Sequence, residues 1–203
     1  MKLSSYLLTL PAIILVAACS PRQSDDAAPL TGDWTLDPVS SHLSFVSVKA
    51  GSIAEANTFK SLSGSITSDG KAQLGIDLSS VDSGVEIRNE RLQTMLFETA
   101  TYPSATVTAQ LDPEAYKALQ PGQSMTVTVP AKLNLHGVEG DVEGELAVTR
   151  AGTDEVIVST IKPIILDANA YGFADGIEKL REAASLPAIT PSVPVSFSVT
   201  FTR

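Results

Sequence analysis

The sequence predicts an all-β protein, an antiparallel barrel or sandwich of about eight or nine strands with two short helices. Apolar residues alternate with small polar residues along several segments, which places one face of each segment on a core and the other in water. Only two segments carry apolar residues at helical spacing. The alternating runs lie near residues 33–37, 42–49, 62–67, 72–79, 105–111, 124–136, 141–149, 155–162 and 193–202.

The last run shows the alternation most clearly. The residues that share one face there are Val193, Val195, Phe197, Val199 and Phe201. Residues 124–136 repeat the pattern over six alternate positions from Met125 to Leu135. Asp69-Gly70, between two runs, is a hairpin turn signal. Residues 151–154 separate two further strands in the same way.

Two segments break the alternation and are predicted to be short helices. Their apolar and charged positions recur every three or four residues, namely Arg88, Leu92 and Leu96 within 85–97 and Ile177, Leu180 and Ala184 within 175–185. Asp175 is expected to cap the N-terminus of the second helix. Tyr102-Pro103 and Leu186-Pro187 mark the return to strand, because the residue before proline disfavours helix.

A barrel that spans a membrane and one that does not both show this alternation, with opposite faces apolar. Spanning barrels carry girdles of aromatic residues, whereas aromatic residues make up 5% of this chain and the polar strand face is mostly Ser and Thr. We therefore expect a barrel that does not span the membrane. A closed barrel of about eight strands is just wide enough to hold one small ligand.

The first 32 residues are expected to lie outside the folded domain. Residues 3–18 follow a basic Lys2 and are nearly free of polar side chains. A membrane span needs about 20 residues, so this shorter stretch predicts a secretory signal. Residues 16–19 (VAAC) resemble the lipobox of bacterial lipoproteins, in which the cysteine is acylated; the alternative is a free thiol beside an ordinary cleavage site. We expect a signal peptide over 1–18, a lipid anchor at Cys19 with a flexible tether over 19–32, and a barrel domain over 33–203.

Charge and composition limit the classes of molecule that this protein is expected to bind. The formal net charge of −9 argues against nucleic acid and against electrostatic docking on anionic membranes. A single cysteine excludes an internal disulfide framework and a cysteine-based zinc cluster. Ser20 follows Cys19, and the lipoprotein resemblance then implies attachment to the outer membrane, facing the periplasm.

Ordered motifs along the chain resemble the YceI-like family. They are residues 34–37 (WTLD), 41–45 (SHLSF), 59–64 (FKSLSG), 84–92 (GVEIRNERL) with Phe97 and Tyr102-Pro103, and 133–138 (LNLHGV). The resemblance runs from Trp34 to Arg203 and implies a lipocalin-like barrel around a long apolar cavity that binds polyisoprenoids or other amphiphilic lipids. Asn89 and Arg91 stand where the family more often has Asp and His, and a helix of about ten residues is added before the last strand.

Within this expectation, large residues that point inward or cap the barrel are candidates for lipid contact, with plain core packing as the alternative for each. They are Phe45, Phe59, Phe97, Leu135, Tyr171, Phe173 and Phe197. Leu92, Met95 and Leu96 are expected to form a lid or plug at one barrel end. Arg88 would contact a phosphate or quinone oxygen at the mouth, or brace the helix against a loop.

No catalytic or metal-binding pattern is found. His42 and His136 are far apart in the sequence and lack carboxylate partners at ligand spacing, and no nucleophile elbow or phosphate-binding glycine loop occurs. We expect no enzyme, no metal and no cofactor beyond a bound isoprenoid lipid. Two functions remain: a carrier or scavenger of a long apolar lipid, or an envelope interaction scaffold that uses loops and the helix over 175–185. Homodimerisation stays open.

Overall fold

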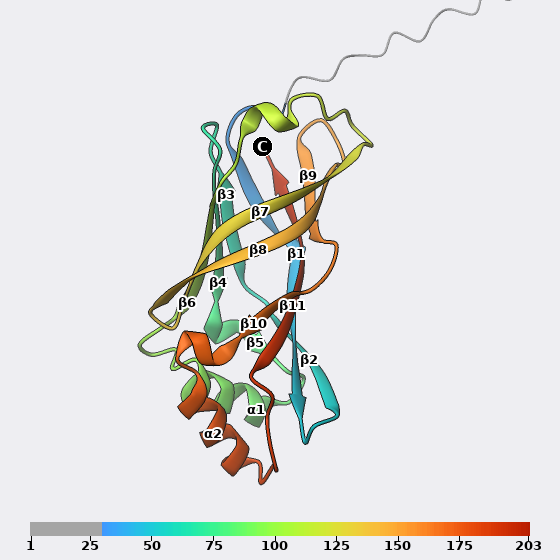
Figure 1. The fold of residues 1–203 in the computed structure, drawn as a ribbon. Helices are drawn as coiled ribbons and strands as arrows, with labels where there is room; N and C mark the ends of the chain where they lie inside the picture. The colour runs from blue at the N-terminus through green and yellow to red at the C-terminus, as the bar shows by residue number, and fades with distance from the viewer. Residues whose placement is uncertain (1–29) are drawn as a thin grey trace, which may run out of the picture.

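The computed structural model describes residues 30–203, which form a closed antiparallel barrel of eight strands (Figure 1). Around the ring the order is β1–β3–β4–β6–β7–β8–β9–β11, and pairing of β11 with β1 closes it. The strands are β1 (Trp34–Lys49), β3 (Leu62–Ile66), β4 (Lys71–Asp77), β6 (Ser104–Gln110), β7 (Ser124–Leu135), β8 (Val138–Arg150), β9 (Glu155–Thr160) and β11 (Ser192–Thr202). The predicted lipocalin-like barrel of about eight strands is confirmed.

Three further strands flank the barrel, and the sequence analysis missed all three. They are β2 (Ile53–Phe59), β5 (Val81–Asp82) and β10 (Ile164–Asp167). β2 pairs with the second half of β1, and β10 pairs with the first half of β11. β2 does not show the alternation of apolar and polar residues, because two of its inward positions, Glu55 and Asn57, are polar.

β1 joins what the sequence predicted as two strands, 33–37 and 42–49. The pairing with β11 shifts between Asp37 and His42, where four residues of β1 stand opposite one residue of β11. Hydroxyl groups replace the missing ladder bonds: the Thr200 N–H donates to Ser41 Oγ at 2.9 Å, and Thr200 Oγ1 donates to the Ser40 carbonyl at 3.2 Å. The strand therefore continues through a bulge that the sequence pattern marks as a gap.

Both predicted helices are present. The first begins as α1 (Glu86–Arg91) and continues as one π-helical turn over Leu92–Leu96, in which the Phe97 N–H donates to the Leu92 carbonyl. The second is α2 (Ala174–Ala183). Asp175 was predicted to cap α2, and this is wrong: Phe173 occupies the cap position without a side-chain bond, and Asp175 lies in the first turn, where its charge favours the helix dipole.

The barrel has two ends of different construction (Figure 1). At one end, here the helical end, α1 and α2 lie beside the β1–β2 hairpin. At the other, here the terminal end, lie residues 30–32, the connection 111–123 with its 3₁₀ turn Pro113–Tyr116, and the C-terminus. Leu30 is buried although the sequence placed it in the tether, so the domain includes at least this residue. The predicted signal peptide and Cys19 lie outside the described residues.

Candidate functional site

An apolar space runs along the inside of the barrel as two adjoining cavities. The cavity in the terminal half has a volume of about 270 Å³, and that in the helical half about 410 Å³. The two share part of their walls, since the same side chains border both: Leu43, Ile76, Leu133, Leu166 and Val195. The interior thus offers one elongated apolar path rather than a single compact pocket.

The terminal half owes its space to small residues at inward positions of β7 and β8. Cross-strand partners there are Val129 with Gly144 and Ala131 with Val142, and all four border the cavity. Phe197, a predicted contact residue on β11, borders the same cavity. Pairing a small with a branched residue leaves volume that two Leu side chains would fill.

The terminal end is covered by side chains, loops and one 3₁₀ turn rather than by an α-helix. Leu30 is buried there, and Tyr116 and Pro113 border the cavity. The guanidinium of Arg150 is completely buried and donates to three backbone carbonyls, Leu119 at 2.9 Å and Gly152 and Thr153 at 3.2 Å. These bonds tie the 111–123 connection to the β8–β9 turn.

The helical half is walled by a chain of aromatic rings. Ring centroids are separated by 5.4 Å for Phe45 and Phe59, 5.6 Å for Phe59 and Phe97, and 5.8 Å for Phe97 and Phe173. Phe97 meets Phe173 edge-on, a geometry that adds to the stabilisation from burial alone. Tyr171 and Leu135 complete the predicted aromatic and apolar contacts in this wall.

The helices cover this half with their apolar faces. Leu92 and Leu96 of the π-helical turn and Ile177 and Leu180 of α2 all border the cavity. The two elements approach closely at Gly176, where an added Cβ would come within 2.8 Å of the Met95 carbonyl oxygen. A scaffold that binds a partner through the helix over 175–185 would need apolar residues of this helix to be exposed. Ile177 and Leu180 instead face inward and are half-buried.

The cavity reaches the surface at the start of α1. Val85 and Ile87 border the cavity and are themselves exposed, with 41% and 54% of their surface accessible. Large apolar side chains that line a cavity and also meet solvent mark its mouth. The mouth therefore lies between α1 and the β1–β2 hairpin, on the side from which Arg88 and Arg91 also border the cavity.

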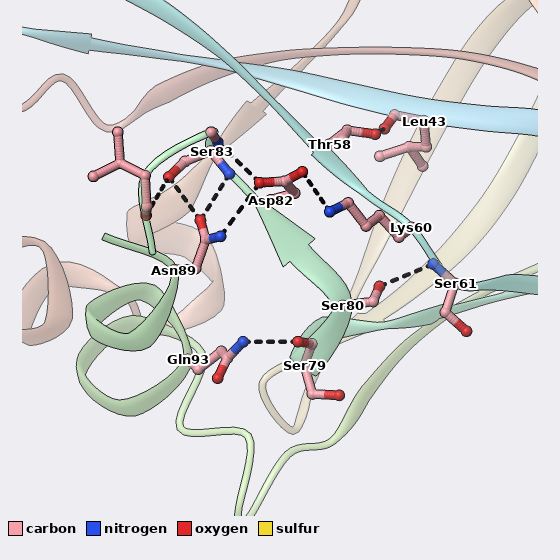
Figure 2. A network of polar contacts seen from close by, with 12 residues as sticks. Leu43, Thr58, Lys60, Ser61, Ser79, Ser80, Asp82, Ser83, Asn89 and Gln93 are labelled. Carbon is pink, nitrogen blue, oxygen red and sulfur yellow. Dashed lines mark hydrogen bonds and ion pairs between the residues drawn. The ribbon is translucent and has the colours of Figure 1, made fainter. Parts of the chain in front are cut away.

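Polar contacts hold α1 in place beside that mouth (Figure 2). The side chain of Asn89 donates to Asp82 Oδ1 at 3.3 Å and accepts from the Ser83 N–H and hydroxyl, both at 2.7 Å. The ion pair with Lys60, together with bonds from the Gly84 N–H and Asn89, lowers the pKa of Asp82 to about 2. An Asp at position 89 would place a second carboxylate beside Asp82, whereas the neutral Asn89 can donate a hydrogen bond to it.

A polar group lies at the inner rim of the mouth. Glu55 Oε1 accepts from Lys49 Nζ at 2.7 Å and from Arg88 Nη2 at 3.1 Å. Arg88 also reaches the Ser83 carbonyl at 3.5 Å, so it braces α1 against β2 and at the same time borders the cavity. Ser47 and Asn57 border the cavity beside these charges.

The structure brings most of the predicted contact residues together. In the helical half lie Phe45, Phe59, Arg88, Leu92, Leu96, Phe97, Leu135, Tyr171 and Phe173, and Phe197 lies in the terminal half. Met95 borders neither cavity, and its backbone carbonyl lies at the close approach to Gly176. Contact with a ligand remains a prediction for all of them.

Sequence reasoning missed Lys49, Glu55, Asn57 and Arg150. A usable signal was present for two of them, since Lys49 continues the inward series of Leu43 and Phe45, and Arg150 continues that of Leu146 and Val148. A charge in register with a buried strand face indicates an internal polar group.

His136 lies in a left-handed turn, with φ of 55°, at the end of β7. Its ring is 4.3 Å from that of Tyr102 and 4.8 Å from that of Phe173, and its Nε2 lies 3.2 Å from Glu98 Oε2. The histidine thus packs behind the aromatic wall of the helical half.

Within residues 30–203, no three His, Cys, Asp or Glu side chains are grouped in a way that could hold a metal ion. The same part of the chain contains no helix with the length and apolar character needed to cross a membrane.

These features define a class: a lipocalin-like antiparallel barrel with an elongated apolar interior and a mouth at one end. The YceI-like domain model matches residues 34–201, and the chain belongs to this family. A polyisoprenoid-binding domain from Saccharophagus degradans, implicated in plant cell wall breakdown, is 43% identical with a TM-score of 0.81, and the match covers 83% of this chain and 97% of that one. The comparison with curated proteins gives no match.

More distant structures share the fold. Burkholderia cenocepacia BcnA is 22% identical with a TM-score of 0.62, over 81% of this chain and 98% of that one. A YceI protein from Campylobacter jejuni is 17% identical with a TM-score of 0.51, over 72% of this chain and 84% of that one.

Proposed function

We propose that this protein binds a long apolar lipid, a polyisoprenoid such as an isoprenoid quinone or polyprenyl phosphate, inside its barrel and acts as a carrier or scavenger. The observation that carries the proposal is the elongated apolar interior, which ends at a mouth with polar side chains. Burial of apolar surface contributes about 25 cal/mol per Å², so a long hydrocarbon chain needs few polar contacts to be held.

The relative from Saccharophagus supports this choice of ligand class, because it is a polyisoprenoid-binding domain of nearly the same extent. The small inward residues of β7 and β8 support it independently, since they leave room deep in the barrel for a chain rather than for a compact ligand. The proposed role is lipid binding, in which the aromatic wall and the two helices cover the lipid in the helical half of the barrel.

The proposal includes attachment of the protein to the outer membrane, facing the periplasm, through an acylated Cys19. Its support is the sequence around residues 16–19. Several acyl chains would hold the protein firmly, whereas a single chain binds only reversibly. Incorporation of labelled palmitate that Cys19→Ser abolishes would establish the anchor, and equal labelling of both chains would contradict it.

The first experiment is mass spectrometry of an organic extract from residues 20–203, expressed in a bacterial periplasm and purified without detergent. This segment contains the whole closed barrel, and the solved Saccharophagus domain has almost the same extent. A stoichiometric isoprenoid or fatty lipid is the expected result. A folded protein without lipid, which also takes up none from added isoprenoids, would contradict the proposal.

The variant Ala131→Phe tests whether the lipid occupies the terminal half. Ala131 borders that cavity, so a phenyl ring there fills space that the chain needs. Ala147→Phe is the matched control, because Ala147 lies between the inward Leu146 and Val148 and points to the outer face of β8. We expect the bound lipid to be lost or shortened only in Ala131→Phe.

A further inference from the structure

The side chain of Asn57 carries a buried acceptor that the protein does not use. Asn57 is 4% exposed, and its Oδ1 has no hydrogen-bond partner among residues 30–203. Its Nδ2, by contrast, donates to Ser47 Oγ and to the Glu55 carbonyl, both at 3.2 Å. A buried acceptor without a donor is unfavourable, and native structures contain few of them.

The orientation of this amide is fixed by its neighbours. Exchanging its oxygen and nitrogen would place Oδ1 against the Glu55 carbonyl oxygen, and two acceptors cannot bond to each other. The nitrogen therefore stays on the side of Ser47 and Glu55, and the oxygen stays the free acceptor.

Asn57 lies at the border between the apolar and the polar part of the helical cavity. Across the β1–β2 pair it stands opposite Phe45, and its neighbours on the same face of β2 are Phe59 toward the barrel and Glu55 toward the hairpin. The cations nearest to Glu55, Lys49 and Arg88, are both already paired with it. The unused group at this border is thus a neutral acceptor.

We propose that the ligand lies with its apolar chain toward the terminal end and with a neutral, donor-bearing head group, a hydroxyl or an amide N–H, against Asn57 Oδ1. This inference rests on the proposed function and specifies the head group that the cavity selects. A head group with only acceptors, such as an ether, an ester or an oxidised quinone, leaves Oδ1 unsatisfied. An alcohol or a quinol satisfies it.

The test compares two probes with the same chain, farnesol and farnesyl methyl ether, by competition with a fluorescent fatty-acid probe. On the unmodified residues 20–203, farnesol should bind about tenfold more tightly than the ether, because only the alcohol can donate. In Asn57→Leu that preference should vanish through weaker binding of farnesol, with the affinity for the ether retained. Asn134→Leu, an exposed position on β7, is the matched control and should keep the preference.

The outcomes separate the inference from the function. If both probes bind equally to the unmodified protein, the head-group inference is wrong while lipid binding stands; this comparison decides it even where Asn57→Leu does not fold. If neither probe binds and the extract contains no lipid, the proposed function fails as well. If farnesyl phosphate binds far more tightly than farnesol and equally to both variants, the selected head group is an anion at the arginines, which overturns the inference.

Discussion

The two ends of the barrel are closed by different physical means. At the terminal end, a completely buried guanidinium donates to backbone carbonyls of two loops, so charge-assisted hydrogen bonds fix the closure. At the helical end, apolar helix faces rest on a cavity, and the polar contacts that hold α1 are only partly buried. Partly exposed polar contacts contribute less than fully buried charge-assisted ones, so we expect the helical end to open at a lower free-energy cost.

The substitution with the largest expected effect on the terminal end is Arg150→Met. The substitution removes the guanidinium donor from the carbonyls of Leu119 and Gly152, and it removes one of two donors from the Thr153 carbonyl, which Arg203 Nη2 also reaches at 3.4 Å. We expect a loss of about 3 kcal/mol or more in the free energy of unfolding. Urea denaturation measures the loss, and hydrogen exchange should speed up in residues 111–123 and 151–154 first. Lys132→Met, an exposed cation on β7, should cost less than about 1 kcal/mol. Equal losses in the two variants would show that Arg150 does not fix the closure.

At the helical end the corresponding change is Gly176→Ala. Helix propensity alone would stabilise α2 by about 1 kcal/mol, but the added Cβ would come within 2.8 Å of the Met95 carbonyl and 3.1 Å of the Leu96 Cα. We expect a net loss of about 1–2 kcal/mol and faster exchange in α2 and the π-helical turn. Ala183→Gly, exposed in the last turn of α2, measures the propensity effect by itself. A stabilised Gly176→Ala would mean that α2 shifts away at no cost.

The smallest expected effect is the dependence of stability on Asp82 at acidic pH. The pKa of Asp82 is lowered from 3.8 to about 2 chiefly by Lys60, so its contribution to stability is present above pH 3.8 and is lost as the pH falls to about 2. Asp82→Asn should lower the melting temperature at pH 6 and leave it nearly unchanged at pH 2. Asp69, in the β3–β4 turn that borders the terminal cavity, has its pKa lowered to about 2 by Lys71 and is the matched control.

Asp82 and Asp69 test whether the two ends of the barrel open independently. Their pKa values are lowered to the same range, and they lie at opposite ends of the barrel. Asp82→Asn should speed up exchange in α1, whereas Asp69→Asn should leave α1 unchanged. Faster exchange of α1 in both variants would show that the ends do not open independently.

The fold could be predicted because each barrel strand has one face on the core, so that Val193 to Phe201 or Met125 to Leu135 alternate visibly. The pattern failed where polar groups take inward positions. Glu55 and Asn57 concealed β2, and four residues bulging from β1 made one strand resemble two. The aromatic wall was predicted from residue size, but the unused acceptor on Asn57 depends on a cross-strand neighbour and on one carbonyl, which no local pattern contains.

The position of Leu30 has a consequence for how a lipid would enter. The described chain begins at the terminal end (Figure 1). The mouth at the start of α1, where the exposed Val85 and Ile87 border the helical cavity, lies at the opposite end. A membrane attachment upstream of Leu30 would therefore join the barrel at the end opposite this mouth, so that the length of the barrel adds to that of the tether between the mouth and the point of attachment.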